Sequence, residues 1–211
     1  MFTKLRFADP TPLGLCAFGL TTLVLSMHNG GIGIPRNAPN NVIVGLAMFY
    51  GGFVQILAGM WEFANETTFG ATAFASYGAF WMSYAVILIP GFGVAAGWEA
   101  GNGGATAAHS IGIYLLGWTI FTFIMMVASF RMHLMMALLF VLLEITYIML
   151  TIGAWRSNES FTVAGGIIGF IVSLIAFYIA ATHLINKRTG FIDMYNIDFS
   201  QKKDENHILE M

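Results

Sequence analysis

The sequence predicts an all-α integral membrane protein with six transmembrane helices. Composition is the first observation, because 57% of the residues are hydrophobic and only 9% are charged, whereas soluble domains carry about 25% charged residues. Length is the second, because 211 residues hold six or seven spans of about 20 residues each and little else. The third is the spacing of the charged residues, which separate apolar runs near residues 12–29, 40–62, 69–90, 110–130, 132–152 and 161–184.

The spans form one domain between two short polar ends. We assign residues 1–9 to a cytoplasmic N-terminal segment, residues 10–185 to the transmembrane domain and residues 186–211 to a polar cytoplasmic tail. The first apolar run follows Asp9-Pro10-Thr11-Pro12 and continues toward His28, which indicates a retained span rather than a cleaved signal. Pro12 suits the first turn of a helix, and Asp9 complements the positive helix N-terminus.

Turn-forming residues mark the ends of the next spans. Asn29-Gly30-Gly31 ends the first span, and Pro90-Gly91 ends the third. We expect Asn65-Glu66-Thr67 to cap the third span. The Gly-rich connection that follows, as far as Asn102-Gly103-Gly104, is expected to be partly helical.

The distribution of lysine and arginine predicts the orientation, because cytoplasmic loops are enriched in basic residues. With six spans, one face carries seven of these residues and the other face carries two. The first set is Lys4, Arg6, Arg131, Lys187, Arg188, Lys202 and Lys203, and the second is Arg36 and Arg156. Both termini are therefore expected in the cytoplasm, and the lack of a targeting signal favours the plasma membrane.

Several functional classes lack support in the sequence. It contains no Walker-type phosphate loop, no His-Glu-x-x-His and no GxSxG elbow, so we expect neither ATP-driven pumping nor enzyme activity. Cys16 is the only cysteine, which excludes an intramolecular disulfide and a Cys-rich metal site. We expect no cofactor and no metal, and the net charge of −2 does not suggest a nucleic-acid partner.

Polar residues inside the spans are the functional candidates, because they are costly in hydrocarbon and usually face a bundle interior or an aqueous path. In the second span, Gly51, Gln55, Gly59 and Glu62 recur at steps of four, four and three, which places them on one helical face. That face is either the wall of a solute path or a helix contact in which Gln55 hydrogen-bonds and the glycines pack.

Glu144 lies in the middle of the fifth span, with Tyr147 and Thr151 on the same face. An unpaired ionised carboxylate there would cost about 2.5–3.5 kcal/mol. The side chain is therefore either a proton carrier or a protonated structural group bonded to a hydroxyl.

The histidines lie near span ends. His28, with Asn29, is either a capping group or a polar group that binds an anion or relays a proton. His109, His133 and His183 are expected to anchor their spans at the membrane interface.

Aromatic and glycine residues also recur at helical spacing. The third-span aromatics form ordinary packing or a hydrophobic gate, and Gly165 with Gly169 indicates close packing within or between subunits. The aromatics are Phe74, Tyr77, Phe80, Trp81 and Tyr84.

Several blocks resemble one known family. Asp9-Pro10-Thr11-Pro12-Leu13-Gly14-Leu15 is similar to the Asn-Pro-x-Pro-Leu-Gly-Leu signature of the acetate uptake transporter family, which includes bacterial succinate–acetate permeases and fungal ammonia/acetate exporters. Met27-His28-Asn29, the stretch from Phe49 to Glu62 and the stretch from Thr68 to Trp81 also resemble family motifs. The resemblance covers about residues 7–185. Asp9 stands where the family has Asn, and Glu144 where an apolar or hydroxyl residue is expected.

The resemblance implies a homohexamer of six-helix protomers, each with its own solute path. It implies a Phe–Tyr–Leu constriction, whose counterparts here are Phe18, Tyr77 and Leu143. It also implies acetate bound along the path near polar groups, here His28, Asn29, Gln55 and Glu62.

The predicted function is transport of acetate, and of other small monocarboxylates or succinate, by proton-linked uptake. Moving one charge against 100 mV costs about 2.3 kcal/mol, so an inside-negative membrane opposes uptake of a lone anion. Co-transport of a proton through Glu144 or His28 removes that cost. The alternatives are a passive acetate channel with a dewetting constriction, a pore for ammonia or urea, and a sensor or scaffold that carries no flux.

Overall fold

The computed structural model describes residues 8–35, 38–101, 103–185, 189–190 and 194, and it confirms the six predicted spans. Three spans are the single helices α1, α4 and α7, and the second is built from α2, η1 and α3 without a break. The elements are α1 (Thr11–Gly30), α2 (Ile43–Met48), η1 (Phe49–Val54), α3 (Gln55–Ala64), α4 (Thr68–Leu88), η2 (Pro90–Phe92), α5 (Val94–Ala100), α6 (Gly104–Ser129), α7 (Leu134–Arg156) and α8 (Glu159–Leu184). The remaining two spans lie in α6 and α8.

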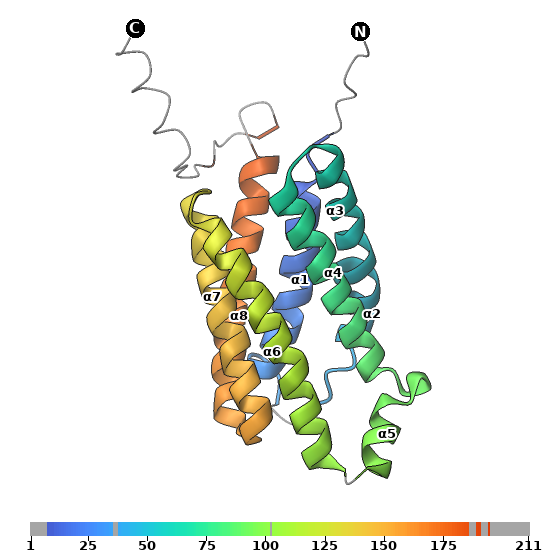
Figure 1. Ribbon diagram of the computed structural model, residues 1–211. Helices are drawn as coiled ribbons and strands as arrows, with labels where there is room; N and C mark the ends of the chain where they lie inside the picture. Colours follow the sequence, from blue (N-terminus) through green and yellow to red (C-terminus); the bar gives the residue numbers. More distant parts are fainter. Residues whose placement is uncertain (1–7, 36–37, 102, 186–188, 191–193, 195–211) are drawn as a thin grey trace, which may run out of the picture.

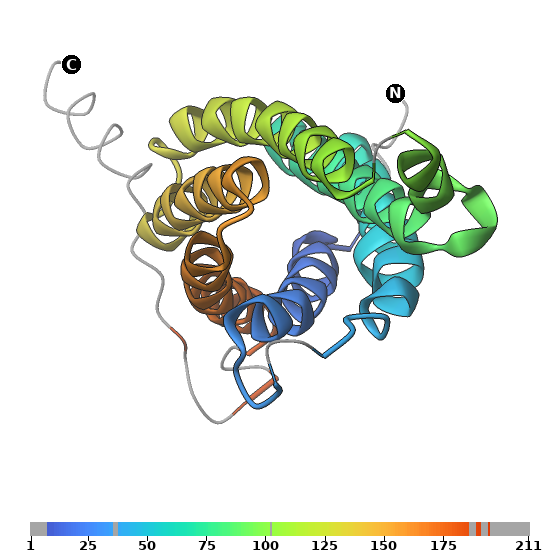
Figure 2. The same ribbon diagram turned by 90° about the horizontal axis from the view of Figure 1, so that it is seen from below.

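The six spans form a closed ring when viewed along the bundle (Figure 2). Helix α1 contacts α8, which contacts α7, and α7 contacts α6. Helix α4 joins α6 to α3, and α3 returns to α1. The start of α1 and the end of α8 lie at the same end of the bundle, while α5 lies at the opposite end (Figure 1).

Two helices extend beyond their predicted spans. Helix α6 begins at Gly104 rather than near residue 110, and α7 ends at Arg156 rather than near residue 152. The extra residues of α6, Gly-Ala-Thr-Ala-Ala-His, are mostly small and only weakly hydrophobic, so hydropathy did not mark them although they are compatible with a helix. Helix α7 ends only where Ser157 takes a left-handed conformation, with φ of 48°. The expected short helix in the Gly-rich connection is α5.

The second span contains a π-helical segment, η1, which was not predicted. Gly51 and Gly52 in this segment are buried, and a side chain at Gly51 would collide with Thr21 of α1. A π-turn inserts an extra residue into a helix and occurs frequently at functional sites. Here it lies directly before Gln55, the first residue of α3.

Of the predicted glycine pair, Gly165 packs against Leu150 of α7, whereas Gly169 and the neighbouring Gly166 pack against α1 within the protomer. A Cβ atom at Gly169 would lie 2.5 Å from the Ser26 hydroxyl oxygen, and one at Gly166 would meet the backbone of Gly30. Substitution at Gly166 or Gly169 would separate α8 from α1.

The signature motif starts α1. Pro10 and Pro12 are buried at the start of the helix, and the Thr11 N–H donates to Asp9 Oδ1 at 3.0 Å, as predicted for an acidic residue at this position. A Cβ atom at Gly14 would lie 2.6 Å from the Phe74 ring of α4. Leu15 is buried, whereas Leu13 is exposed.

The predicted terminal segments fall largely outside the described residues. Arg131 and Arg156 lie at opposite ends of α7, as the predicted topology requires. The other seven basic residues used in that prediction fall outside the described ranges.

Candidate functional site

Three cavities follow one another through the ring of helices, with volumes of about 370, 40 and 160 Å³. Phe18 and Leu143 line both the first cavity and the second. The second and third cavities share four lining residues, Leu25, Asn29, Phe80 and Leu150. Because neighbouring cavities are separated by the thickness of shared side chains, they form a row through the bundle.

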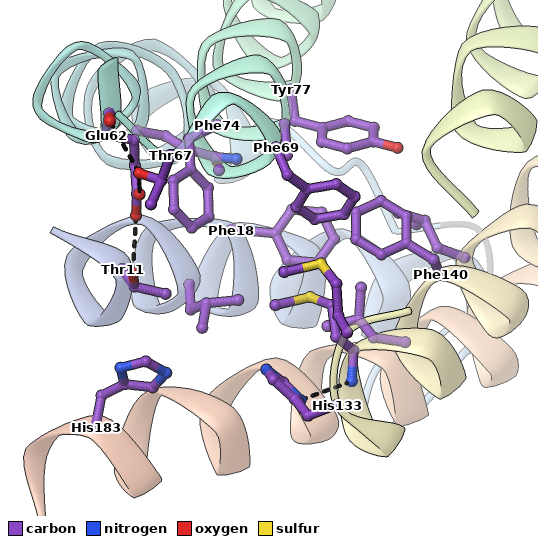
Figure 3. A pocket seen from close by; sticks show the side chains of 18 of the residues that line it. Thr11, Phe18, Glu62, Thr67, Phe69, Phe74, Tyr77, His133, Phe140 and His183 are labelled. Carbon is purple, nitrogen blue, oxygen red and sulfur yellow. Dashed lines mark hydrogen bonds between the residues drawn. The ribbon is translucent and has the colours of Figure 1, made fainter. Parts of the chain in front are cut away.

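The first cavity lies at the end of the bundle where α1 starts and α8 ends (Figure 3). Its walls are mainly apolar and include Phe69, Phe74 and Phe140. Polar side chains from five helices or their caps gather around it, namely Thr11, Gln55, Glu62, Thr67, His133 and His183.

Gln55 is fully buried on the wall of this cavity. Neither its amide nitrogen nor its amide oxygen has a hydrogen-bond partner among the described residues. A buried polar group without a partner costs about 1–3 kcal/mol. The predicted hydrogen bond across a helix contact is therefore not formed among the described residues, and the amide lies unpaired in the wall of the cavity.

Glu62 is buried and held by two threonine hydroxyls. Thr11 Oγ1 donates to Glu62 Oε1 at 2.7 Å. Thr67 Oγ1 contacts both Glu62 Oε2 and the Glu62 carbonyl oxygen, the latter at 2.8 Å. The Thr67 side chain therefore does not cap α4, contrary to the prediction, because it is used by the preceding helix. Gly70 provides the space, since a Cβ atom there would lie 2.7 Å from Glu62 Cδ.

Of the three predicted constriction residues, Phe18 and Leu143 lie between the first two cavities, and Tyr77 lines the first cavity beside Phe18. The Phe18 and Tyr77 rings have centroids 5.9 Å apart, and both side chains are buried, as is Leu143. The Tyr77 hydroxyl shares a 2.9 Å hydrogen bond with Thr122 Oγ1 of α6. This bond satisfies the phenol away from the cavity and leaves the apolar ring as its wall.

The aromatic face of α4 follows the whole row. Phe74 and Tyr77 line the first cavity, Phe80 and Trp81 the second, and Phe80 and Tyr84 the third. Side chains three or four positions apart share a helical face, so one helix supplies an aromatic wall to all three cavities.

Two predicted proton-handling residues do not line these three cavities. Glu144 is 7% exposed, and its Oε2 atom has no hydrogen-bond partner among the described residues. His28 is half-buried at the end of α1, and its Nδ1 atom likewise lacks a partner there. Asn29 lines the second and third cavities, and Tyr147 lines the second.

His133 and His183 line the first cavity, although the sequence suggested only interfacial anchoring. His133 Nδ1 accepts the Met136 N–H at 3.2 Å and so caps α7. His183 Nδ1 lies 2.7 Å from Asp9 Oδ2. Burial alone would raise the pKa of Asp9, but hydrogen bonds from Thr11 and His183, with the charge of His183, lower it below its usual value. No periodic pattern joins residues 9 and 183, so only closure of the helix ring reveals this pair.

Six apolar spans around a row of cavities define a multi-pass membrane protein of the small helical-bundle class. The chain belongs to the GPR1/FUN34/yaaH family, which it matches over residues 1–201.

Relatives and a solved structure agree with this assignment. The chain is 44% identical over 190 residues, 89% of its length, to ammonia transport outward protein 2 of Saccharomyces cerevisiae. It is 35% identical over 186 residues to the succinate-acetate/proton symporter SatP of Escherichia coli, covering 88% of this chain and 93% of that protein. It is similar to the solved structure of the bacterial acetate channel SatP, with a TM-score of 0.77, 33% identity and coverage of 90% of this chain and 100% of that chain. These relatives are named as transporters or channels, not enzymes.

The chain spans only about 65% of the length of the yeast relative and of others like it.

Proposed function

We propose that this protein carries acetate, and other small monocarboxylates or succinate, across a membrane together with a proton. The observation that carries the proposal is Gln55, whose amide has no partner among the described residues and lies on the wall of an apolar cavity that is followed by two further cavities. An apolar chamber with a few convergent polar groups is the usual form of a small-molecule site.

The chemistry of Gln55 suits a carboxylic acid in particular. An amide carries both a donor nitrogen and an acceptor oxygen, and a protonated carboxyl group also carries one donor and one acceptor. The two groups can form a pair of hydrogen bonds, whereas an ionised carboxylate can only accept. The free amide therefore favours the protonated acid, which is chemically equal to the anion plus a proton.

The constriction supports the same choice. Phe18 and Leu143 present apolar surface between the first two cavities, and the Tyr77 ring packs against Phe18 on the wall of the first. An ion loses its hydration there without compensation, whereas a neutral acid loses much less. Movement as the neutral acid also removes the cost of carrying a charge against the membrane potential. The relatives named as a succinate-acetate/proton symporter and an acetate channel agree with a carboxylate substrate.

A second candidate substrate is ammonia. The 44% identical yeast relative is named as an ammonia transport protein, and ammonia is a small neutral molecule that an apolar constriction admits. A competition assay separates the two candidates. Unlabelled propionate should reduce the flux of acetate but not the flux of ammonia.

The assembly and placement form part of the proposal. We infer a homohexamer in the plasma membrane, with residues 1–9 and 186–211 in the cytoplasm and residues 10–185 as the transport domain. Outward-facing aromatic side chains of the second span, including Phe49 and Phe63, are exposed in the single chain. Lipid or neighbouring protomers would cover them.

The test is uptake of labelled acetate by purified protein in liposomes, with and without an inward proton gradient. Protein-free liposomes correct for acetic acid that crosses the lipid. Gradient-driven accumulation of acetate that falls in Gln55→Leu and persists in Thr21→Val supports the proposal. Thr21→Val is the control because Thr21 is fully buried but lines none of the three cavities. Equilibration regardless of the gradient would indicate a channel, and absence of acetate flux where ammonia passes would reject the acetate assignment.

The same assay tests the predicted proton carriers. Loss of gradient-driven accumulation in Glu144→Gln, or in His28→Gln, with passive exchange retained, is the result expected of a carrier. Unchanged accumulation would leave that residue a structural group.

A further inference from the structure

Asp9 and His183 join the start of α1 to the last turn of α8 beside the first cavity. Their closest atoms, Asp9 Oδ2 and His183 Nδ1, lie 2.7 Å apart, and His183 also lines the cavity (Figure 3). Asp9 is the position at which this chain departs from the asparagine of the family signature.

The contact determines which nitrogen of His183 carries the proton. Asp9 Oδ1 accepts the Thr11 N–H at 3.0 Å, and the lowered pKa of Asp9 keeps this carboxylate ionised at neutral pH. An ionised carboxylate only accepts hydrogen bonds, so Nδ1 must be the donor. Neutral His183 then has no proton on Nε2, which leaves that nitrogen as a base.

We propose that Nε2 of His183 accepts the proton from the carboxylic acid that reaches the first cavity, and that Asp9 is the positioning residue for this step. The inference rests on the proposed proton-linked transport. It assigns the proton acceptor to a residue that sequence analysis treated as an interfacial anchor.

The step is balanced and reversible. The O–H bond of the acid breaks and an N–H bond forms at Nε2, which gives a carboxylate anion and an imidazolium. The anion leaves to water from the wide cavity, and the imidazolium then releases its proton to water and restores the starting state. Transfer from a carboxylic acid to imidazole is favourable by about a hundredfold in water, from their ordinary pKa values of about 4.3 and 6.5. The Asp9 carboxylate stabilises the imidazolium by opposite charge.

Other titratable groups on this cavity are Glu62, His133 and Tyr77. The Glu62 carboxylate already accepts hydrogen bonds from Thr11 and Thr67. His133 Nδ1 is the acceptor in the cap of α7, which places its ring proton on Nε2 when the ring is neutral. The Tyr77 hydroxyl is bonded to Thr122. The geometry gives His183, on this cavity, a basic nitrogen oriented by a carboxylate.

The direct test is ¹⁵N NMR of histidine-labelled full-length protein in lipid nanodiscs, with the His183 signals assigned by their loss in His183→Asn. We expect neutral His183 to carry its proton on Nδ1 and to gain a second proton on Nε2 as the pH falls. In Asp9→Asn the preference of the neutral ring for the Nδ1 proton should weaken. A neutral form protonated on Nε2 in the wild type would overturn the proposal whatever the transport result.

The transport test uses His183→Asn, because the asparagine amide can still donate to Asp9 from nearly the same position but offers no base. His109→Asn is the matched control, since His109 lines none of the three cavities. We measure labelled acetate entry and acidification of a trapped pH dye in proteoliposomes. His183→Asn should slow both at least about tenfold, since a positioned base contributes about 10²–10⁴-fold and water partly replaces it. Asp9→Asn should lose less of the transport rate than His183→Asn, and His109→Asn should behave as wild type.

The outcomes separate this inference from the function on which it rests. If wild-type protein carries acetate and His183→Asn keeps both the rate and the pH profile, the proton acceptor is refuted while transport stands. If wild-type protein carries no acetate beyond protein-free liposomes, the proposed function itself fails.

Discussion

Replacing Gln55 with leucine should make the protein more stable and less active. Leucine has a similar size but no polar atoms, so Gln55→Leu removes two buried groups that lack partners. Each such group costs about 1–3 kcal/mol of stability when it is fully desolvated. The cost is smaller for Gln55 because the residue lies on a cavity wall. We therefore expect a gain of about 1–3 kcal/mol in the free energy of unfolding. For a chain of this size, that gain raises Tm by about 2–12 °C.

The loss of transport follows from the same two atoms. An acid paired with the amide through two hydrogen bonds loses both in the variant, at about 0.5–1.5 kcal/mol for each neutral bond. The expected fall in kcat/KM for acetate is about ten- to hundredfold. Thermal unfolding of detergent-purified protein and initial uptake in proteoliposomes measure the two effects on one preparation.

Thr21→Val is the matched control for this pair of effects. Thr21 is also fully buried, but its hydroxyl donates to the Ala17 carbonyl oxygen at 2.9 Å. This variant should show no gain in Tm and near-normal uptake. A Gln55→Leu protein that is less stable than wild type and still transports normally would refute the reasoning, because the amide would then have a structural partner and no substrate role.

Three further predictions test the packing, the rim and the constriction. Gly14→Ala should lower the free energy of unfolding by about 1–3 kcal/mol, because its Cβ atom would lie 2.6 Å from the Phe74 ring; an unchanged Tm would show that the ring moves aside freely. The pKa of Asp9 is lowered in the folded protein, so its ionised form stabilises the fold above the unfolded pKa and this contribution is lost as pH falls below about 4. Asp9 is half-exposed, so its contribution to the free energy of unfolding is below about 1 kcal/mol. Asp9→Asn removes this contribution, so its Tm should fall less than that of wild type as the pH is lowered; parallel plots of Tm against pH for the two proteins would contradict this. Phe18→Ala should widen the constriction and raise uptake of succinate relative to acetate by about tenfold, measured as a ratio of initial rates, whereas an unchanged ratio would place the selective barrier elsewhere.

Hydropathy and helical spacing predicted the spans and the polar face of the second span. A span needs a long apolar run, so the six runs were visible without knowledge of their neighbours. Gln55 and Glu62 were identified because helical spacing places them on one face, and both line the first cavity. Phe18, Tyr77 and Leu143 came instead from the family resemblance, since an apolar side chain at a constriction looks the same in sequence as one in a core.

The rest of the site depends on contacts between distant segments. The π-helical segment before Gln55 has no hydropathy signal, because its residues are as apolar as the helix around them. His133 and His183 were assigned to the membrane interface from their places at span ends. Their role on the cavity arises when the ring closes and brings the end of α8 against the start of α1. Thr67 was expected to cap its own helix, but its hydroxyl is turned toward Glu62 at the end of the preceding helix and donates to it instead.

The two ends of the row of cavities differ in acid–base chemistry. The first cavity carries a carboxylate and two histidines, whereas the described residues that line the second and third include no carboxylate and no imidazole. Polar groups there are hydroxyls, the indole of Trp81 and the amide of Asn29. With the proposed cytoplasmic termini, the end with titratable groups faces the cell interior. Acid taken up from an acidic medium is already protonated and needs no base at the outer end, whereas a base at the inner end can take the proton as the acid is released as its anion. This difference between the two ends explains why a histidine is useful beside the first cavity and not beside the third.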